Sequence, residues 1–331
     1  MELLTRHIRR TATLLVILLF AVVAASCGDD EPTSITIASS TPIESPQVVV
    51  ALQNGFFEEN NLTVEITRFT SGRDALTALL GGQADYAIMA ELPASSAAMA
   101  GEDYRILAEV SSLSGHQKVM TRTDTGITSF ADLAGRDVGL LVGTSSHYEL
   151  QLAMESVGMS SADVNIVGLA PPAQPGALEN GDVDAIVAFD SFYVATKDLL
   201  GDRYAEIPGT GYHLRFLFAA GGSMLDNDEV SENVLRALLD AEELIGSDPA
   251  KAKADIVEWS EGQVNAARAD AVFSTYVFGL NLDSGLVTQM VDEGQWLRDE
   301  QGVDGDPTAA LFTSYINSGP LSAVASDRVN L

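Results

Sequence analysis

One eight-residue pattern occurs twice in this chain, and it limits the possible folds more than any other feature. Residues 78–85 and 177–184 share the form A-L-x-x-G-x-x-D, and the copies start 99 residues apart, at 78 and 177. Each copy ends a helical pattern, turns at a glycine and enters a short apolar run, Tyr86–Met89 or Ala185–Ala188. A single spacing of this size is too long for a solenoid repeat. The pattern predicts two lobes of similar construction that present these strand ends to a shared cleft. The alternative is a chance match between two ordinary helix–turn–strand segments.

Short apolar runs alternate with helical patterns from Ile35 onward, which is typical of α/β proteins with mostly parallel strands. At 331 residues the chain is long for one hydrophobic core, so we expect two lobes. Residues 35–120 plus 214–331 are predicted to form lobe one, and residues 121–213 lobe two. An apolar strand at 214–220 would return the chain to lobe one. The helices expected to pack on lobe one after it span residues 229–245, 249–259, 267–278, 286–298 and 308–316.

The N-terminus has the pattern of an export signal. Arg6, Arg9 and Arg10 form a basic head, and residues 11–26 are almost unbroken apolar sequence that ends in small residues. This run is shorter than the roughly 20 residues that a membrane-spanning helix needs. Residues 1–26 are therefore predicted to be a signal peptide.

Cys27 is the only cysteine of the chain, so no internal disulfide is possible. Residues 24–28, Ala-Ala-Ser-Cys-Gly, resemble the lipobox of bacterial lipoproteins, in which the cysteine is lipidated and becomes the first residue. The resemblance implies a lipidated Cys27 at the start of a polar tether, residues 27–34. It also implies an exported protein held by lipid at the outer face of the cytoplasmic membrane. The alternative is a cleaved signal with an incidental cysteine.

Composition excludes several functions. The chain has 18 basic and 47 acidic residues, a net charge of -29, and this balance argues against nucleic-acid binding. It has four histidines at wide spacing and lacks the H-E-x-x-H, G-x-S-x-G and P-loop patterns. We therefore expect no enzyme activity, no cofactor and no metal site.

A second feature lies at residues 136–150, where an apolar run is followed by Gly143, Thr144, Ser145 and Ser146 and then by a helical pattern. A strand that passes into a helix through small hydroxyl residues leaves backbone N–H groups free at the positive end of the helix dipole. This arrangement predicts a seat for an anionic or hydrogen-bond-accepting group. The alternative is an ordinary helix N-cap by Ser145 or Ser146.

Several segments resemble a known family. Residues 55–65 (G-F-F-E-E-N-N-L-T-V-E), 132–139, 143–146 and 181–190 are similar to substrate-binding proteins of ABC importers for nitrate, sulfonate, taurine and pyrimidine precursors. Residues 226–259 are similar to the helical C-terminal part of that family. The resemblance implies an α/β, two-lobed periplasmic-binding-protein fold with mixed sheets, two crossover strands and a helical C-terminal segment on lobe one. It also implies a monomer that closes on a small solute and delivers it to a membrane permease.

The family's binding positions correspond to four stretches of this chain: Ser39, Ser40, Thr41 and Pro42; Ala90, Glu91 and Leu92; Gly143, Thr144, Ser145, Ser146 and His147; and Phe189, Asp190 and Phe192. Each has a structural alternative. Glu91 and Asp190 are also suited to capping the helices that follow them. His147 is equally suited to facing solvent, the phenylalanines to a core, and Arg73 to the surface rather than to an anion.

The sequence therefore predicts an exported solute receptor. An oxyanion at the hydroxyl-rich junction, with an amino group near Glu91 and Asp190, would suit an aminosulfonate or an amino-bearing heterocycle. A receptor for a pyrimidine or thiamine precursor, or one that presents its solute to a sensor protein, is the alternative. An enzyme that shares this fold is less favoured, because its cysteine-rich active segment is absent.

Overall fold

The computed structural model describes residues 31–41, 43–115 and 117–331. The predicted signal peptide, Cys27, Pro42 and His116 lie outside the described residues. Residues 34–331 form one compact unit, and the account below concerns that unit. No helix within the described ranges is long and apolar enough to cross a membrane.

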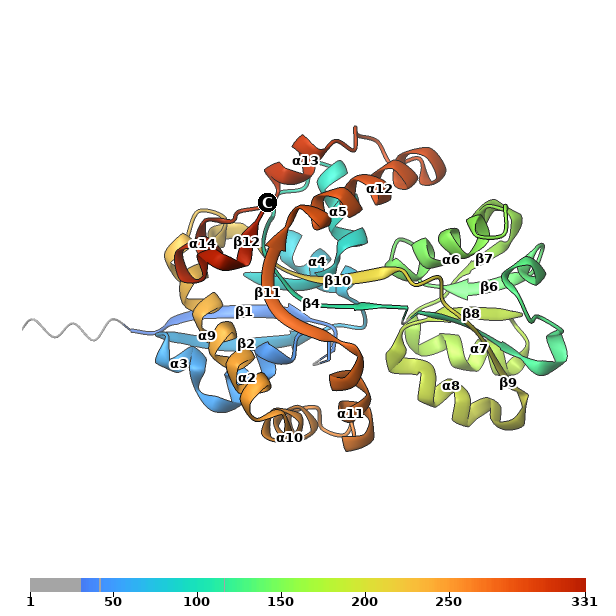
Figure 1. Ribbon diagram of the computed structural model, residues 1–331, viewed down its shortest axis with the longest axis horizontal. Coiled ribbons are helices and arrows are strands. Elements are labelled where there is room, and N and C mark those ends of the chain that lie inside the picture. The colour runs from blue at the N-terminus through green and yellow to red at the C-terminus, as the bar shows by residue number, and fades with distance from the viewer. Residues whose placement is uncertain (1–30, 42, 116) are drawn as a thin grey trace, which may run out of the picture. The chain divides into compact units, whose positions relative to one another are not determined.

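A seven-stranded mixed sheet forms the centre of lobe one (Figure 1). Its strand order is β12-β11-β4-β10-β3-β1-β2. Strand β3 pairs in parallel with β1 and antiparallel with β10, which in turn is antiparallel to β4. The strands span Thr33–Ser39 (β1), Leu62–Arg68 (β2), Tyr86–Ala90 (β3), Arg105–Ser114 (β4), His213–Ala220 (β10), Val277–Asp283 (β11) and Val329–Asn330 (β12).

A five-stranded mixed sheet forms the centre of lobe two, in the order β7-β6-β8-β5-β9. Strand β6 lies parallel to β7 and β8, whereas β5 is antiparallel to β8 and β9. The strands span Lys118–Arg122 (β5), Asp137–Leu140 (β6), Asn165–Gly168 (β7), Ala185–Ala188 (β8) and Tyr204–Pro208 (β9). Because β5 belongs to this sheet, lobe two includes residues from 118 onward. The predicted domain boundaries near 121 and 213 stay predictions.

Helices cover both sheets because neighbouring strand residues point to opposite faces. In lobe one, α2 packs against α9 and α10, whereas α5 packs against α12 and α13 (Figure 1). In lobe two, Val119 and Val187 pack with α6, while their neighbours Met120 and Ile186 pack with α7 and α8. The helices span Pro46–Asn54 (α2), Phe56–Glu59 (α3), Gly72–Leu80 (α4), Glu91–Met99 (α5), Ser145–Glu155 (α6), Gln174–Asn180 (α7), Tyr193–Leu200 (α8), Asp228–Ser247 (α9), Pro249–Trp259 (α10), Ala266–Thr275 (α11), Ser284–Gln301 (α12), Ala309–Ser314 (α13) and Gly319–Val324 (α14).

Two short segments carry the chain between the lobes. Residues 115–117 connect β4 to β5, and residues 209–212 connect β9 to β10. The two crossovers lie side by side, since the amide of Gly115 donates to the carbonyl of Tyr212 at 3.2 Å. Lobe two is therefore attached to lobe one through a paired hinge.

The repeated pattern forms the same structure in both lobes. Its glycines, Gly82 and Gly181, have φ of 69° and 81°, a left-handed conformation that glycine adopts without strain. After each turn the aspartate accepts a hydrogen bond from the neighbouring parallel strand, Asp85 from the Thr36 amide at 2.8 Å and Asp184 from the Asp137 amide at 3.2 Å. The prediction of two similarly built lobes is confirmed at this turn.

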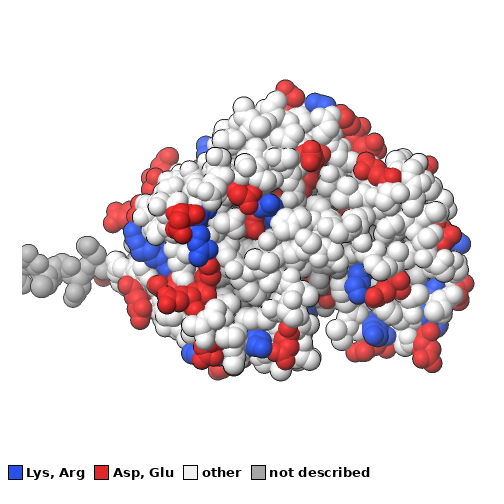
Figure 2. Space-filling model, viewed as in Figure 1, with Lys and Arg blue, Asp and Glu red and all other residues white. Residues whose placement is uncertain are grey.

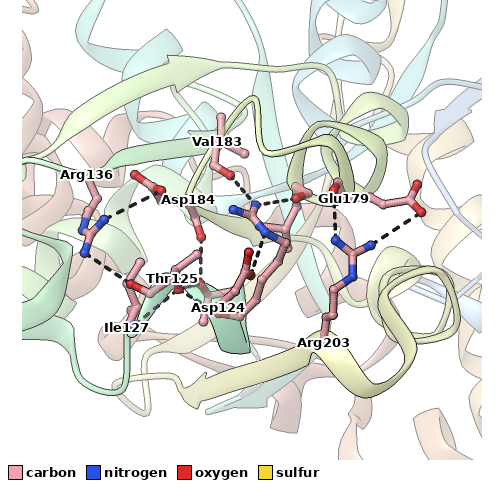
Figure 3. Close-up of polar contacts among 11 residues, drawn as sticks. Asp124, Thr125, Ile127, Arg136, Glu179, Val183, Asp184 and Arg203 are labelled. Atoms are coloured by element: carbon pink, nitrogen blue, oxygen red, sulfur yellow. Dashed lines mark hydrogen bonds and ion pairs between the residues drawn. The ribbon is translucent and has the colours of Figure 1, made fainter.

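In lobe two, two arginines lie beside the repeated turn, and Figure 3 shows one of them, Arg136, directed at Asp184. The Arg122 guanidinium donates to the carbonyls of Leu178 and Val183, at 2.6 and 3.0 Å, on either side of Gly181. Arg136 lies 3.9 Å from Asp184, the last residue of the pattern. The Leu178 carbonyl also accepts from the Gly181 amide at 3.3 Å, so Arg122 adds a second donor at the end of α7, where helix carbonyls lack intrahelical partners.

One secondary-structure prediction is wrong. The helix expected at 267–278 ends at Thr275, and β11 begins two residues later. Strand β11 contains Val277, Phe278 and Leu280, and buried and partly buried residues alternate toward its end. It pairs with β4 and lies between β4 and the short strand β12. β-Branched and aromatic residues fit a pleated, half-buried surface, so pairing with β4 outweighs the helical pattern.

Candidate ligand-binding cleft

A cavity lies between the two lobes, beside the crossovers. It contains about 500 Å³ of space that atoms do not fill, part of it open to solvent. Lobe one contributes the segment after β1, the end of β3, the starts of α4 and α5, strand β10 and the residue after α11, and lobe two contributes the segments after β6 and β8. The cavity is lined by Glu44, Gly72, Arg73, Ala90, Pro93, Gln117, Thr144, Ser145, Phe189, Asp190, Leu214, Phe216 and Tyr276.

The hydroxyl-rich junction forms one wall. Thr144 is the N-cap residue of α6, but its hydroxyl donates to the carbonyl of Leu141 at 2.7 Å instead of capping the helix. Ser145 is the first helical residue, and its hydroxyl accepts from the Gln117 side chain at 3.1 Å. The proposed cap by Ser145 or Ser146 is therefore wrong, because both lie inside the first turn. The first N–H groups of a helix have no intrahelical partner, and those of α6 lie beside Ser145.

Two carboxyl groups line the same cavity, Glu44 from lobe one and Asp190 from lobe two. The Ser40 hydroxyl donates to Glu44, and the Tyr276 hydroxyl donates to Asp190 at 3.3 Å. The Glu44 residue is partly exposed, but its carboxyl group is surrounded by protein. This burial raises the pKa of Glu44 to about 8. The charge of Asp190 acts in the same direction, whereas Arg268 and the Ser40 hydrogen bond oppose it. Near neutral pH the Glu44 carboxyl thus holds a proton that it can donate.

Arg73 lines this cavity, and Arg268 lines the chamber that adjoins it. Arg73, at the start of α4, donates to the carbonyl of Val142 in lobe two, so this side chain, expected on the surface, also joins the lobes. Arg268 donates through Nη1 to the carbonyl of Ser191 at 3.3 Å. Its Nη2 is buried and has no hydrogen-bond partner among the described residues. A buried guanidinium N–H without an acceptor is costly, so this group is suited to an acceptor that a ligand supplies.

A second, more open chamber adjoins the first and shares Glu44 and Phe189 with it. Ser40, Thr41, Phe192 and Arg268 are among its lining residues. The two chambers together provide an inner polar pocket and an outer space in which a larger substituent can lie.

Some of the predicted site residues line one of the two chambers, and others line neither. Ala90, Thr144, Ser145, Phe189 and Asp190 line the inner chamber, and Ser40, Thr41 and Phe192 line the outer one. The predicted residues that line neither chamber are Ser39, Glu91, Leu92, Gly143, Ser146 and His147. Phe189 and Phe192 thus border the chambers, although a core position was their alternative.

Glu91 and His147 need correction in particular. The Glu91 side chain is fully buried, and its carboxyl accepts from Tyr212 and from the backbone of Arg215, away from the cavity. His147 is only 2% exposed and packs edge-on against Trp296. Its side chain therefore faces neither the solvent nor the cleft. Burial lowers the pKa of His147 to about 4, which keeps the ring neutral.

Sequence reasoning missed several cleft residues, among them Glu44, Gln117, Phe216 and Tyr276. Glu44 follows the predicted loop after the first strand by only a few residues, and that proximity was the one available signal. Gln117 lies in a crossover and Tyr276 lies at the end of α11, so only the folded chain brings them to the cleft. Within the described ranges, no group of three or more His, Cys, Asp or Glu residues is arranged to hold a metal ion.

Comparison with known proteins now gives the class of protein. Residues 43–252 match the family described as NMT1/THI5 like, and the chain belongs to this family. It is 28% identical over 166 residues, 50% of this chain and 51% of the relative, to the taurine-binding periplasmic protein of Escherichia coli. It is 30% identical over 159 residues, 44% of this chain and 46% of the relative, to a putative thiamine biosynthesis protein of Haemophilus influenzae. The matches thus span about half the length of these curated relatives.

The fold is that of a solved binding protein. The alkanesulfonate-binding protein SsuA from Xanthomonas axonopodis pv. citri, bound to MOPS, superposes with a TM-score of 0.72 at 19% identity. The superposition covers 87% of this chain and 99% of that protein. The predicted periplasmic-binding-protein fold, with two mixed sheets and two crossovers, is confirmed.

Proposed function

We propose that the protein is an extracytoplasmic solute receptor that closes its two lobes on a small organic solute and delivers it to an ABC permease. The observation that carries the proposal is a single cavity lined by both lobes, with Ser145 and Asp190 from lobe two and Glu44 and Tyr276 from lobe one. A solute that contacts both lobes favours the closed state by the free energy of its additional contacts. The names of the taurine-binding and alkanesulfonate-binding relatives support this function.

We propose an aminosulfonate-like solute. The N–H groups at the start of α6, the Ser145 hydroxyl and the two arginines suit an oxyanion. The carboxyl groups of Asp190 and Glu44, which line the same cavity, suit an ammonium or amino group. A ligand with an anionic and an amino end would satisfy both sets of groups at once.

The test is a binding screen with the purified protein. Taurine, longer alkanesulfonates, nitrate and aminopyrimidines are each added, and the melting temperature and tryptophan fluorescence are recorded. Trp296 of α12 contacts His147 of α6, so its emission should report a change in the contact between the lobes. Ser145→Ala should weaken binding at least about tenfold, the value of one lost hydrogen bond to a charged group. Ser247→Ala, an exposed serine of α9, should leave binding unchanged.

A negative screen across all four solute classes would reject this substrate proposal. A solute that shifts the wild type and the Ser145→Ala variant equally would show that it binds elsewhere.

A second candidate is a receptor for an amino-bearing pyrimidine. Phe216 and Tyr276 lie nearly parallel in the cavity wall, with ring centroids 6.2 Å apart and an interplanar angle of 12°. Beside these rings, the protonated Glu44 carboxyl can donate to a ring nitrogen while Asp190 accepts from an amino group. The relative named as a putative thiamine biosynthesis protein agrees with this candidate. Preferential stabilisation by aminopyrimidines over taurine would favour it.

We also propose that Cys27 is lipidated and anchors a monomeric receptor at the membrane, and that the cleft binds rather than transforms its solute. Metabolic labelling with radioactive palmitate should mark the wild type and not Cys27→Ser, which should be released into the soluble extracytoplasmic fraction. Light scattering on the purified receptor would test the monomer. Presentation to a sensor protein stays the alternative to transport, and co-purification with a permease would distinguish them.

A further inference from the structure

A buried polar cluster lies beside the crossover, outside both ligand chambers. Glu91 of α5 and Glu293 of α12 are each 0% exposed, and Tyr212 of the 209–212 crossover lies between them. The Tyr212 hydroxyl contacts Oε1 of Glu91 and lies 2.7 Å from Oε1 of Glu293. Gln289 completes the cluster, with its side-chain nitrogen 3.1 Å from each of these two oxygens.

Each Oε2 atom has a donor of its own, the Arg215 amide for Glu91 at 2.9 Å and the Ser95 hydroxyl for Glu293 at 3.0 Å, so the shared contacts are those of the two Oε1 atoms. Tyr212 has one hydroxyl proton, yet its oxygen lies within hydrogen-bonding distance of both groups. The Gln289 amide has two protons for three acceptors, because it also lies 2.8 Å from the carbonyl of His213. A proton on one carboxyl group completes the set, since the protonated group can donate to Tyr212 while Tyr212 donates to the other.

No cation replaces this proton. Among the residues that the structure describes, no lysine or arginine forms an ion pair with Glu91 or Glu293. The nearest candidate, Arg215, directs Nη1 to Glu109 at 2.5 Å and to Asp283 at 3.3 Å. Only its backbone N–H reaches Glu91, at 2.9 Å. Two ionised carboxylates in such a place would carry a large, uncompensated cost of burial.

We infer that Glu91, Glu293 and Tyr212 share one proton at the hinge, and that this proton favours the conformation in which the lobes touch. These are positioning residues, because they act on the angle between the lobes and not on the solute. The inference rests on the proposed function in one respect: it takes opening and closing of the cleft to be the motion that matters. It assigns a role to a residue that sequence reasoning had placed in the ligand site.

The coupling follows from where Tyr212 lies. Its backbone belongs to the crossover, and its ring packs edge-on against Tyr148 of α6, with centroids 5.4 Å apart. Hinge rotation must therefore move Tyr212 relative to α5 and α12, which carry the carboxyl groups. Separation of the lobes admits water, which can solvate a second carboxylate. The touching conformation should hold the proton more tightly than the open one.

The direction with pH follows from this difference. Burial raises the pKa of Glu91 to about 7 and that of Glu293 well above its ordinary value. A conformation with raised carboxyl pKa values is favoured at low pH and loses this advantage as the pH rises through them. The population with separated lobes should therefore grow between about pH 5.5 and 9. The growth is up to about tenfold for each unit by which the carboxyl pKa differs between the touching and the open conformation.

Other titratable groups face the cluster. His213 and Arg215 belong to β10, Glu109 to β4, Asp283 precedes α12, and Tyr148 belongs to α6. Glu109 forms an ion pair with Arg215, and although burial opposes it, the Arg215 charge holds the pKa of Asp283 below its ordinary value. Burial raises the pKa of Tyr148 beyond the pH range used. His213 is partly buried, which lowers its pKa, and it is the remaining group that needs a control.

The test needs no solute. Spin labels are attached to cysteines introduced at Ala254 of α10 and Leu199 of α8, both exposed, in the full chain with Cys27 replaced by serine. Pulsed electron paramagnetic resonance then gives the distribution of distances between the lobes at pH 5.5, 7 and 9. In the parent protein we expect the longer distances to gain population with pH. Glu293→Gln should make the distribution independent of pH, because an amide keeps the shape of the group without a titrating proton.

Glu91→Gln provides a second variant should Glu293→Gln fail to fold, and the same loss of pH dependence is expected. Glu258→Gln removes an exposed carboxylate from α10, and His213→Gln removes the nearby imidazole; both should keep the parent response. A parent distribution that does not change with pH would overturn the inference, as would a response that survives both cluster variants or disappears in His213→Gln. A negative solute screen together with a pH response would reject the proposed substrates only.

Discussion

Gly209 offers the sharpest test of the paired hinge. A Cβ atom at this position would lie 1.9 Å from the carbonyl oxygen of Gln117, in the other crossover, and 2.9 Å from Oε1 of Glu149. Cβ contacts below 3.0 Å essentially never occur, so Gly209→Ala must move the two crossovers apart by at least 1.1 Å (3.0 minus 1.9). The obstacle is backbone, and no side-chain rotation relieves it.

The cost of this displacement has two parts. Overpacking in a close-packed region costs about 1–3 kcal/mol. The same displacement threatens the bond of 2.6 Å from the Thr210 amide to Glu149, whose carboxyl is almost fully buried, and hydrogen bonds to charged groups contribute about 1.5–3 kcal/mol. We expect Gly209→Ala to destabilise the fold by about 2–4 kcal/mol and to lower the melting temperature by about 5–10 °C.

Thermal unfolding followed by circular dichroism measures this effect. Gly246→Ala is the matched control, since Gly246 lies in α9 and a methyl group added there would have nothing within 4 Å of it. That change should be neutral or stabilise by about 0.5–1 kcal/mol, because alanine loses less conformational freedom in a helix. If Gly209→Ala melted with the wild type while Gly246→Ala behaved as expected, the close contact between the crossovers would be refuted.

Three further predictions concern the cleft and the start of α6 beside it. Ser146→Ala should leave stability unchanged or raise it by about 1 kcal/mol in chemical denaturation, because the Ser146 hydroxyl is buried without a partner in the described chain. Glu44→Gln should flatten the pH dependence of the melting temperature: the proton-binding Glu44 carboxyl stabilises the fold fully below about pH 4.5 and loses this contribution as the pH rises through about 8. The variant should therefore melt above the wild type at about pH 9, and equal slopes from about pH 5 to 9 would contradict the assignment. Arg73→Met should weaken solute binding about tenfold in titration calorimetry, with little change in melting temperature, because Arg73 is exposed and joins the lobes through Val142.

Much of the fold follows from local sequence. The repeated turn was predictable because a glycine and an aspartate at fixed spacing determine it within eight residues, and the structure has a left-handed glycine, Gly82 or Gly181, at each turn. Most helices were also found from their apolar periodicity. Strand β11 was not, because pairing with β4, far away in the chain, decides its conformation.

The site was less predictable, because its residues come from separate parts of the chain. Ser145 was found through the strand–helix junction, a local pattern. Gln117 and Tyr276 carry no local signal, and the lobes must assemble before either reaches the cavity.

The distribution of surface charge could not be predicted either, although the total charge can be counted from the sequence. On the face drawn in Figure 2, acidic side chains are spread widely, with basic side chains beside them in several places.

The repeated pattern explains why Glu91 was assigned to the wrong place. Glu91 and Asp190 each stand six residues after the aspartate of their copy, and equivalent positions suggest equivalent roles. The strand ends are indeed equivalent, but their surroundings differ. In lobe two, Asp190 begins a short 3-10 helix beside the cavity, where it accepts from Tyr276. In lobe one, Glu91 is the first residue of α5, and α12 covers it, so Tyr212 and Gln289 surround its carboxyl. Of two carboxyl groups at matching positions, one therefore lies beside the hinge under α12 and the other beside the cavity.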